Sequence, residues 1–135
     1  MMTTSEEQFV QDWHAFTARR LVAAEFGVAE SDLCRPTRAT ADIAFARQVA
    51  MYLAHVIFSM SYNDVAQAFG RERSTVAHAC AVIEDARDDR EFDARLEKLE
   101  ARMTQLADLR RQRMISKKGR LEMILRASQE SVSRA

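Results

Sequence analysis

The sequence predicts an all-α protein: a small helical domain with helical extensions at its N- and C-terminal ends. Only three glycines and one proline occur in 135 residues, whereas an all-β fold needs turn residues at short intervals. Apolar residues recur at helical spacing along nearly the whole chain. The length suits one domain with an appended element. The two cysteines are too few for a disulfide framework.

The charge is balanced overall but unevenly distributed along the chain. Twenty Lys and Arg residues oppose twenty Asp and Glu residues, and this zero net charge by itself argues against nucleic acid as a partner. Residues 1–30 carry a net charge of −3, residues 31–82 of +1, residues 83–100 of −4 and residues 101–135 of +6. Seventeen of the twenty bases are arginines, whose planar fork matches phosphates and guanine edges.

The first predicted helix begins near Ser5, which forms a capping box with Gln8, and it ends at Gly27. Three aromatic residues recur along it at helical spacing: Phe9, Trp13 and Phe16. We expect these rings to be mostly core residues that cover an open face of the domain. The alternative is a surface for a second copy of the chain or for another protein.

Residues 42–57 form the clearest helix, after a loop or short turn over residues 31–40. Its apolar stripe comprises Ile43, Ala46, Val49, Ala50, Leu53 and Ile57.

A short helix, a tight turn and a longer helix follow. Ser61 can cap a helix over residues 62–69, Gly70 ends that helix, and a second helix spans residues 73–86. This is the layout of a helix-turn-helix, whose second helix enters the DNA major groove. The residues expected to face the core are Val76, Cys80 and Ile83.

The start of the second helix carries side chains suited to DNA. Ser74, Thr75 and His78 fall mostly on the faces away from the core, and hydroxyls near a helix N-terminus are good phosphate ligands. Arg71 and Arg73 flank them and could reach phosphates or guanine. The alternative is an ordinary helical hairpin, in which Ser74 is only a cap and His78 is merely exposed.

Two sequence motifs, ARQVAMYL at residues 46–53 and FGRERSTVAHAC at residues 69–80, favour the DNA-binding interpretation. Together with LVAAEFGVAESDL at residues 21–33, they closely resemble the C-terminal DNA-binding domain of the bacterial chromosomal replication initiator, DnaA. The resemblance covers roughly residues 20–90. It divides the chain into an N-terminal helical extension (residues 1–19), a helix-turn-helix DNA-binding domain (residues 20–90) and a charged helical C-terminal extension (residues 91–135).

The resemblance implies a role for each residue that matches the family motif. Arg47 and Gln48 match a pair that contacts the DNA backbone, while Thr75 and His78 match positions that face the major groove. Ser74 replaces a threonine that touches DNA. The full predicted DNA-binding set is Arg38, Arg47, Gln48, Arg71, Glu72, Arg73, Ser74, Thr75 and His78.

Four departures from the family motif change the expected base preference. Glu72 and Arg73 stand where the family has an Asp-His pair that reads bases, and the turn is one residue shorter. Val82 replaces an expected lysine. The minor-groove arginine of the upstream loop aligns near Ala39, with Arg38 close by. We therefore expect double-stranded DNA as the partner and a sequence different from the initiator's own box, with Arg73 favouring guanine.

Motifs for other functions are missing from this sequence. It contains no Walker motif or glycine-rich phosphate loop, and its three histidines are scattered. We expect no catalytic residues, no metal site, no cofactor and no bound nucleotide. No signal peptide and no apolar run of about 20 residues is apparent. We therefore expect a cytoplasmic, nucleoid-associated protein that does not enter a membrane.

The C-terminal extension combines an apolar seam with a basic cluster. The seam, at heptad spacing, consists of Phe92, Leu96, Leu99, Met103 and Leu106. It could pack back on the domain or pair with a second copy, and we lean towards a homodimer. Residues 116–119 are expected to interrupt the helix before a final short helix over residues 120–127. The basic cluster, either a phosphate-gripping arm or a solvated helix face, comprises Arg110, Arg111, Arg113, Lys117, Lys118 and Arg120.

The leading functional prediction is a sequence-specific DNA-binding protein that acts as a bacterial transcriptional regulator. One alternative is a replication accessory factor that binds origin DNA and competes with or assists the initiator. The other is a protein-interaction module on the same fold.

Overall fold

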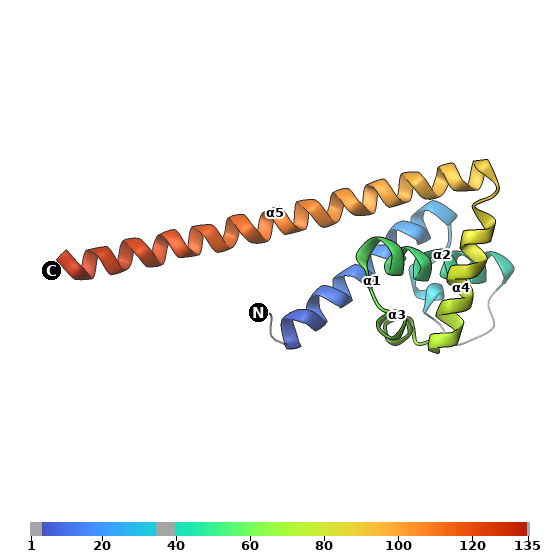
Figure 1. Cartoon of the computed structure of the whole chain (residues 1–135), viewed down its shortest axis with the longest axis horizontal. Helices are drawn as coiled ribbons and strands as arrows, with labels where there is room; N and C mark the ends of the chain where they lie inside the picture. The colour runs from blue at the N-terminus through green and yellow to red at the C-terminus, as the bar shows by residue number, and fades with distance from the viewer. Residues whose placement is uncertain (1–3, 35–39, 135) are drawn as a thin grey trace. The chain divides into compact units, whose positions relative to one another are not determined.

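The computed structural model describes residues 4–34 and 40–134, and the side chains as far as residue 131. The described residues form five α-helices and one 3₁₀ helix and contain no strand, which confirms the predicted all-α class (Figure 1). In chain order the elements are α1 (Thr4–Phe26), η1 (Glu30–Leu33), α2 (Ala41–Phe58), α3 (Tyr62–Phe69), α4 (Arg73–Ala86) and α5 (Arg90–Arg134).

The chain divides into two compact units, residues 1–103 and residues 104–135. In the first unit, α2 is the central helix, and α1, η1, α3 and α4 all contact it. α1 runs without a break across residue 19, and α5 contributes residues 90–103 to this unit.

Eight of the 18 residues of α2 are buried. By length and composition this helix is apolar enough to cross a membrane, but its buried residues belong to the core of the first unit. The same composition is typical of a core helix that is covered by other helices. The apolarity of α2 is therefore accounted for by packing within the chain.

The aromatic residues of α1 do not form the core that we expected. Phe9 is 64% exposed and Phe16 is 42% exposed, while Trp13 is half-buried with its ring centroid 5.9 Å from that of Phe58. Small side chains occupy the buried face of α1 instead, because they allow this helix to approach the core closely. These buried residues are Ala15, Thr17, Ala18, Val22 and Ala23.

α5 is continuous from Arg90 to Arg134, so the expected interruption at residues 116–119 is wrong. One glycine inside a helix costs only about 1 kcal/mol relative to alanine, and Gly119 is the sole residue in that stretch with a strong preference against helix. The predicted final helix over residues 120–127 is part of this single helix.

The part of the α5 apolar seam that belongs to the first unit packs against other residues of the same chain. Leu96, Leu99 and Met103 are buried, and the ring of Phe92 lies 5.3 Å from that of Phe45. This part of the seam is therefore not available to a second copy. At the same time Arg95 pairs with Glu25 of α1 at 3.2 Å.

Arg87, the C-cap residue of α4, joins α4 to α2 and α5. Its Nε donates to Oδ1 of Asp93 at 2.5 Å, and its Nη1 donates to the hydroxyl of Tyr52 at 3.0 Å and lies 2.6 Å from Oε1 of Glu100. Burial alone lowers the pKa of Arg87, but its hydrogen bonds to Asp93 and Tyr52 and its pairing with the Glu100 carboxylate raise that pKa above its ordinary value. The network thus fixes the C-terminal end of α4 with a permanently charged group.

Gly70 ends α3 with φ 63°, in the left-handed region that glycine adopts without strain. Replacing Gly70 with alanine should lower the free energy of unfolding by about 1 kcal/mol. The cost is conformational, because no atom lies within 4 Å of the added Cβ. Chemical denaturation monitored by circular dichroism measures this change. Gly119→Ala, inside α5, is the matched control and should not destabilise the chain; a Gly70→Ala variant as stable as the wild type would contradict the left-handed turn.

Candidate nucleic-acid interface

α3, the turn at residues 70–72 and α4 form a helix-turn-helix with the bounds that the sequence predicts. The hydroxyl of Ser61 accepts a hydrogen bond from the Asp64 backbone N–H at 3.1 Å, which caps the start of α3. At its end, the Arg71 N–H donates to the Ala66 carbonyl at 2.9 Å while Gly70 is left-handed. This Schellman-type ending turns the chain sharply into α4.

α4 has a buried face and an exposed face. Val76, Ala79, Cys80 and Ile83 are buried, so three of these four were correctly predicted from periodicity. The exposed residues at its N-terminal end include Arg73, Ser74, Thr75 and His78. Four of the side chains that the sequence motifs assign to DNA are therefore accessible near the N-terminal end of α4.

The N-terminus of α4 adds its own positive potential to this surface. Glu72 is the N-cap residue, and among the described residues its side chain makes no capping hydrogen bond. Its carbonyl oxygen accepts from Thr75 and Val76 N–H. The Arg73 and Ser74 N–H groups precede these bonds at the positive end of the helix dipole, where anions are stabilised. The exposed carboxylate of Glu72 suits a base-edge amino group rather than a phosphate.

Arg47 is half-buried and hydrogen-bonded to the backbone of η1. Its Nε donates to the Leu33 carbonyl at 2.8 Å, and its Nη2 donates to the Asp32 carbonyl at 2.9 Å. Burial, followed by the nearby charge of Arg71, lowers the pKa of Arg47. Two of its three nitrogens thus hold η1 against α2, a positioning role that the sequence did not reveal.

Arg47 of α2 lies near Arg71 of the turn. Gln48 follows Arg47 on α2 and is also half-buried. Arg71 lies close enough to Arg47 for their charges to interact, and its Nη1 donates to the Gly70 carbonyl at 3.3 Å. The two guanidinium groups repel one another, so an anion near both would be stabilised.

Arg73 contacts a residue that was not among the predicted site residues. Its guanidinium carbon lies 5.6 Å from the ring centroid of Tyr62, at the start of α3. The Tyr62 ring in turn lies 4.4 Å from that of His55. No periodicity argument could find these contacts, because they join three different helices.

The remaining residues predicted to contact DNA do not belong to the helix-turn-helix or to α2. Arg38 lies outside the described residues. The side chains of the predicted arm all belong to α5 in the second unit, where Arg110 is half-buried and the others lie at or near the surface. Arg111 lies 3.8 Å from Asp108 one turn earlier, in an exposed pair that contributes little to stability.

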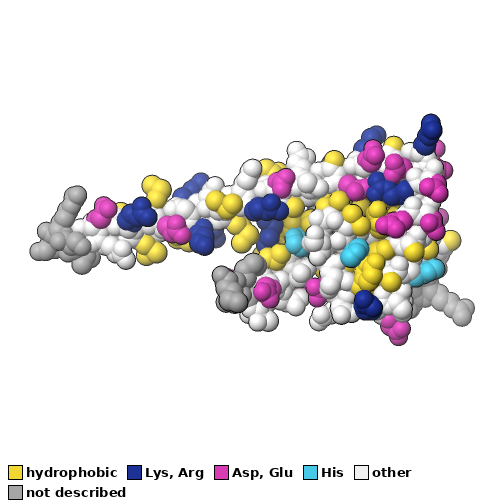
Figure 2. All heavy atoms as spheres, in the orientation of Figure 1, with side chains coloured by type: hydrophobic (Ala, Val, Ile, Leu, Met, Phe, Trp, Pro, Cys, Tyr) yellow, Lys and Arg dark blue, Asp and Glu magenta, His cyan; other side chains and the backbone are white. Residues whose placement is uncertain are grey.

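Acidic side chains dominate the surface where α4 leads into α5 (Figure 2). Their positions contrast with the arginines at the beginning of α4, so the charge changes sign along this helix. The exposed acidic residues of this region are Glu84, Asp85, Asp88, Asp89 and Glu91.

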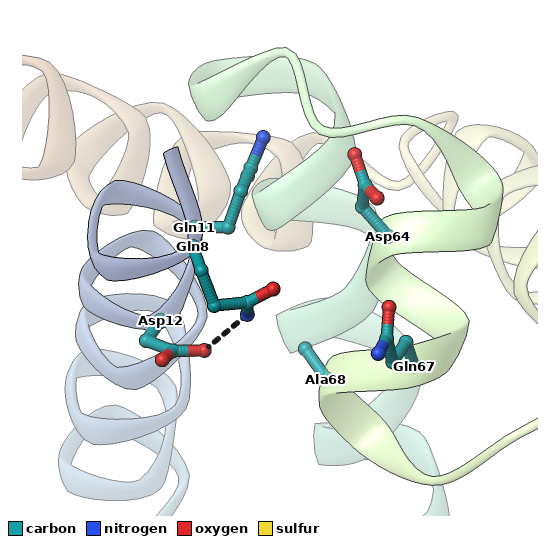
Figure 3. A pocket seen from close by; sticks show the side chains of 6 residues that line it. All are labelled: Gln8, Gln11, Asp12, Asp64, Gln67 and Ala68. Carbon is teal, nitrogen blue, oxygen red and sulfur yellow. Dashed lines mark hydrogen bonds between the residues drawn. The ribbon is translucent and has the colours of Figure 1, made fainter. Parts of the chain in front are cut away.

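A polar pocket of about 310 Å³ lies between α1 and α3 (Figure 3). Asp12 and Asp64 contribute its two carboxylates, and Gln8 donates to Asp12 at 2.9 Å. None of the described residues that line it is a lysine or an arginine, so this lining does not suit a phosphate. Separately, no group of three or more metal-ligating side chains occurs within the described part of the chain.

Cys80 belongs to the core face of α4 rather than to a reactive site. Burial, and secondarily the charge of Glu84, raise the pKa of its thiol to about 11. The thiol is therefore neutral at physiological pH and acts as a small apolar side chain.

The fold and this surface define a helix-turn-helix DNA-binding type of domain. Residues 18–83 match the family model described as the bacterial DnaA protein helix-turn-helix. The central segment of the chain is thus similar to the helix-turn-helix of DnaA, as the sequence motifs predicted.

The curated relatives are initiators that this chain matches only in part. The chromosomal replication initiator protein DnaA 1 of Protochlamydia amoebophila is 51% identical over 63 residues, which are 47% of this chain and 14% of the relative. The DnaA of Rhodopseudomonas palustris strain TIE-1 is 42% identical over 67 residues, 49% of this chain and again 14% of the relative.

Solved structures show the same fold. A crystal structure of a DNA replication initiation factor aligns with a TM-score of 0.68 and 25% identity over 75% of this chain and 31% of that one. The replication initiator DnaA bound to AMPPCP and single-stranded DNA aligns with a TM-score of 0.65 at 24% identity, also over 75% of this chain and 31% of the other.

Arg47 should contribute to stability as well as to any contact with DNA. Arg47→Met keeps most of the side-chain stem but removes both hydrogen bonds to η1, so the free energy of unfolding should fall by about 1–3 kcal/mol. Urea denaturation measures this change. Arg73→Met, at an exposed position, is the matched control and should cost no more than about 1 kcal/mol. Equal stability of Arg47→Met and the wild type would show that the hydrogen bonds to η1 do not stabilise the fold.

Proposed function

We propose that the chain binds double-stranded DNA in a sequence-specific manner, with α4 as the recognition helix. The observation that carries the proposal is the division of α4 into a buried apolar face and an exposed face with Arg73, Thr75 and His78 at its N-terminal end. A helix-turn-helix of the DnaA type supports the same mode of binding. The proposal is one of binding, without a catalytic step.

The expected target differs from the initiator's own box. Glu72 and Arg73 occupy the position of the family's base-reading Asp-His pair. Arginine donates two parallel hydrogen bonds to guanine O6 and N7, and glutamate accepts from cytosine N4. Selection of binding sites from random duplex DNA with the full chain tests this point. Recovery of a site with a G·C pair at the Arg73 position would support the proposal, and recovery of the initiator box would contradict it.

Arg73→Ala should lower the affinity for the selected site by about 1–3 kcal/mol and relax the preference at a single base-pair position. Fluorescence anisotropy with the selected duplex and a one-base variant measures both effects. Arg126→Ala, an exposed arginine on α5, is the control and should leave the site preference unchanged. Intact affinity and preference in Arg73→Ala would show that α4 is not the recognition helix.

We further propose that the basic cluster of α5 binds phosphates. Each phosphate that is neutralised contributes about −0.9 to the slope of log K against log salt concentration. Replacing Arg110, Arg111, Arg113, Lys117, Lys118 and Arg120 together with glutamine should make this slope shallower by about 0.9 for each phosphate that these side chains neutralise, while the preferred sequence stays the same. An unchanged slope would show that these side chains form only a solvated helix face.

The proposed biological role is transcriptional regulation in the bacterial cytoplasm, on nucleoid DNA. The similarity to replication initiators supports a second candidate, a replication accessory factor that binds origin DNA. Genome-wide mapping of bound DNA separates the two, since peaks at promoters favour regulation and a peak confined to the origin favours replication. A protein-interaction role would remain if the chain enriched no DNA sequence.

A homodimer is proposed only through the second unit of the chain. Three residues of the seam, Leu96, Leu99 and Met103, are already buried within one chain. Further along α5, three apolar side chains are more than half exposed: Leu121, Ile124 and Leu125. Pairing of these residues between two copies would present two recognition helices to paired half-sites.

A further inference from the structure

A stack of side chains lies beside the start of α4 and joins three helices. The Arg73 guanidinium lies over the Tyr62 ring at 5.6 Å. The Tyr62 and His55 ring centroids are 4.4 Å apart, with their planes tilted by 35°. Arg73 comes from α4, Tyr62 is the first residue of α3 and His55 belongs to the last turn of α2.

The far end of this stack is anchored to buried backbone. His55 Nδ1 lies 2.8 Å from the carbonyl oxygen of Met60. Because a carbonyl oxygen only accepts, Nδ1 carries the hydrogen of this bond. Met60 is 1% exposed, so the bond ties the half-buried rings of His55 and Tyr62 to the core. The Tyr62 ring is thus a fixed platform at the edge of the exposed surface of α4.

We propose that Tyr62 is the positioning residue that sets the base preference of Arg73, a role that rests on the proposed recognition function of α4. The attraction between a guanidinium and an aromatic ring face is electrostatic and does not use the guanidinium N–H groups as hydrogen-bond donors to another residue. The N–H groups of Arg73 therefore stay available for the two parallel hydrogen bonds to guanine. The platform therefore restricts the arginine without occupying its donors.

Restriction of Arg73 matters because a free arginine loses much rotamer freedom when it binds. A side chain that is already held in one region of space loses less, which raises both affinity and discrimination. Arg71, which lies in the turn before α4, donates instead to the Gly70 carbonyl at 3.3 Å. Tyr62 thereby acts on the arginine at the base-reading position of the family motif.

A double-mutant cycle tests this proposal with the full chain and the duplex selected by the wild type. Tyr62→Leu removes the aromatic face but keeps an apolar side chain, and Tyr62→Phe keeps the face and removes the hydroxyl. Each change is made in the wild-type background and in Arg73→Ala. Affinity is measured for the selected duplex, and site selection from random DNA is repeated for the single variants.

In the wild-type background, Tyr62→Leu should weaken binding about two- to fivefold, and Tyr62→Phe should bind as the wild type does. In the Arg73→Ala background, Tyr62→Leu should cause no further loss. Site selection with Tyr62→Leu should relax the same base-pair position as Arg73→Ala does. A merely structural defect would instead weaken binding to every sequence and relax no single position.

Two results would overturn the positioning role while leaving the proposed function intact: an equal loss from Tyr62→Leu in both backgrounds, or full affinity and preference in Tyr62→Leu. Failure of the wild type to enrich any duplex would overturn the proposed function itself, and the positioning role with it. Thermal unfolding of each variant by circular dichroism identifies any loss of affinity that comes from unfolding.

Discussion

The burial of α2 is the constraint on which the first unit depends. α1, η1, α3 and α4 all pack on this one helix, and small buried residues such as Ala46, Ala50 and Ala54 allow their close approach. The hydrophobic effect acting on this helix therefore determines where the other helices lie. Arg47, at a half-buried position of α2, lies close enough to Arg71 of the turn for their charges to interact.

Polar interactions then fix the two ends of α4, the proposed recognition helix, against this core. At the C-terminal end, Arg87 bonds to Tyr52 of α2 and pairs with Asp93 and Glu100 of α5. At the N-terminal end, Arg73 rests against Tyr62. Removing one member of such a partly buried charge network is costly because it leaves the partners uncompensated. The orientation of α4 consequently depends on both of its neighbours in sequence, α3 and α5.

The sequence predicts those features of the fold that depend on interactions between residues close together in the chain. The bounds of α3 and α4 follow from Ser61 and Gly70 and match the structure, and the buried face of α4 follows from helical spacing. The continuity of α5 does not follow from glycine as a helix-ending signal, because the cost of one glycine, about 1 kcal/mol, does not outweigh the helix preference of its neighbours. The exposure of Phe9 and Phe16 was missed because periodicity identifies an apolar face without showing which of two faces meets the core. The contacts of the site residues, such as the hydrogen bonds of Arg47 to residues 32 and 33, required the tertiary structure because they depend on how separate helices pack.

The zero net charge of the chain conceals a separation of charge along α4. Arg71 and Arg73 stand at the N-terminal end of α4, where the helix dipole is also positive. Acidic residues, including Glu84, Asp85 and Asp88, stand at its other end. This distribution of charge would attract a DNA duplex to one end of α4 and repel it from the other, which favours a single direction of approach in the proposed mode of binding. The acidic residues also offset the long-range attraction that basic DNA-binding proteins rely on. In the proposed mode, binding therefore depends more on contacts at the N-terminal end of α4.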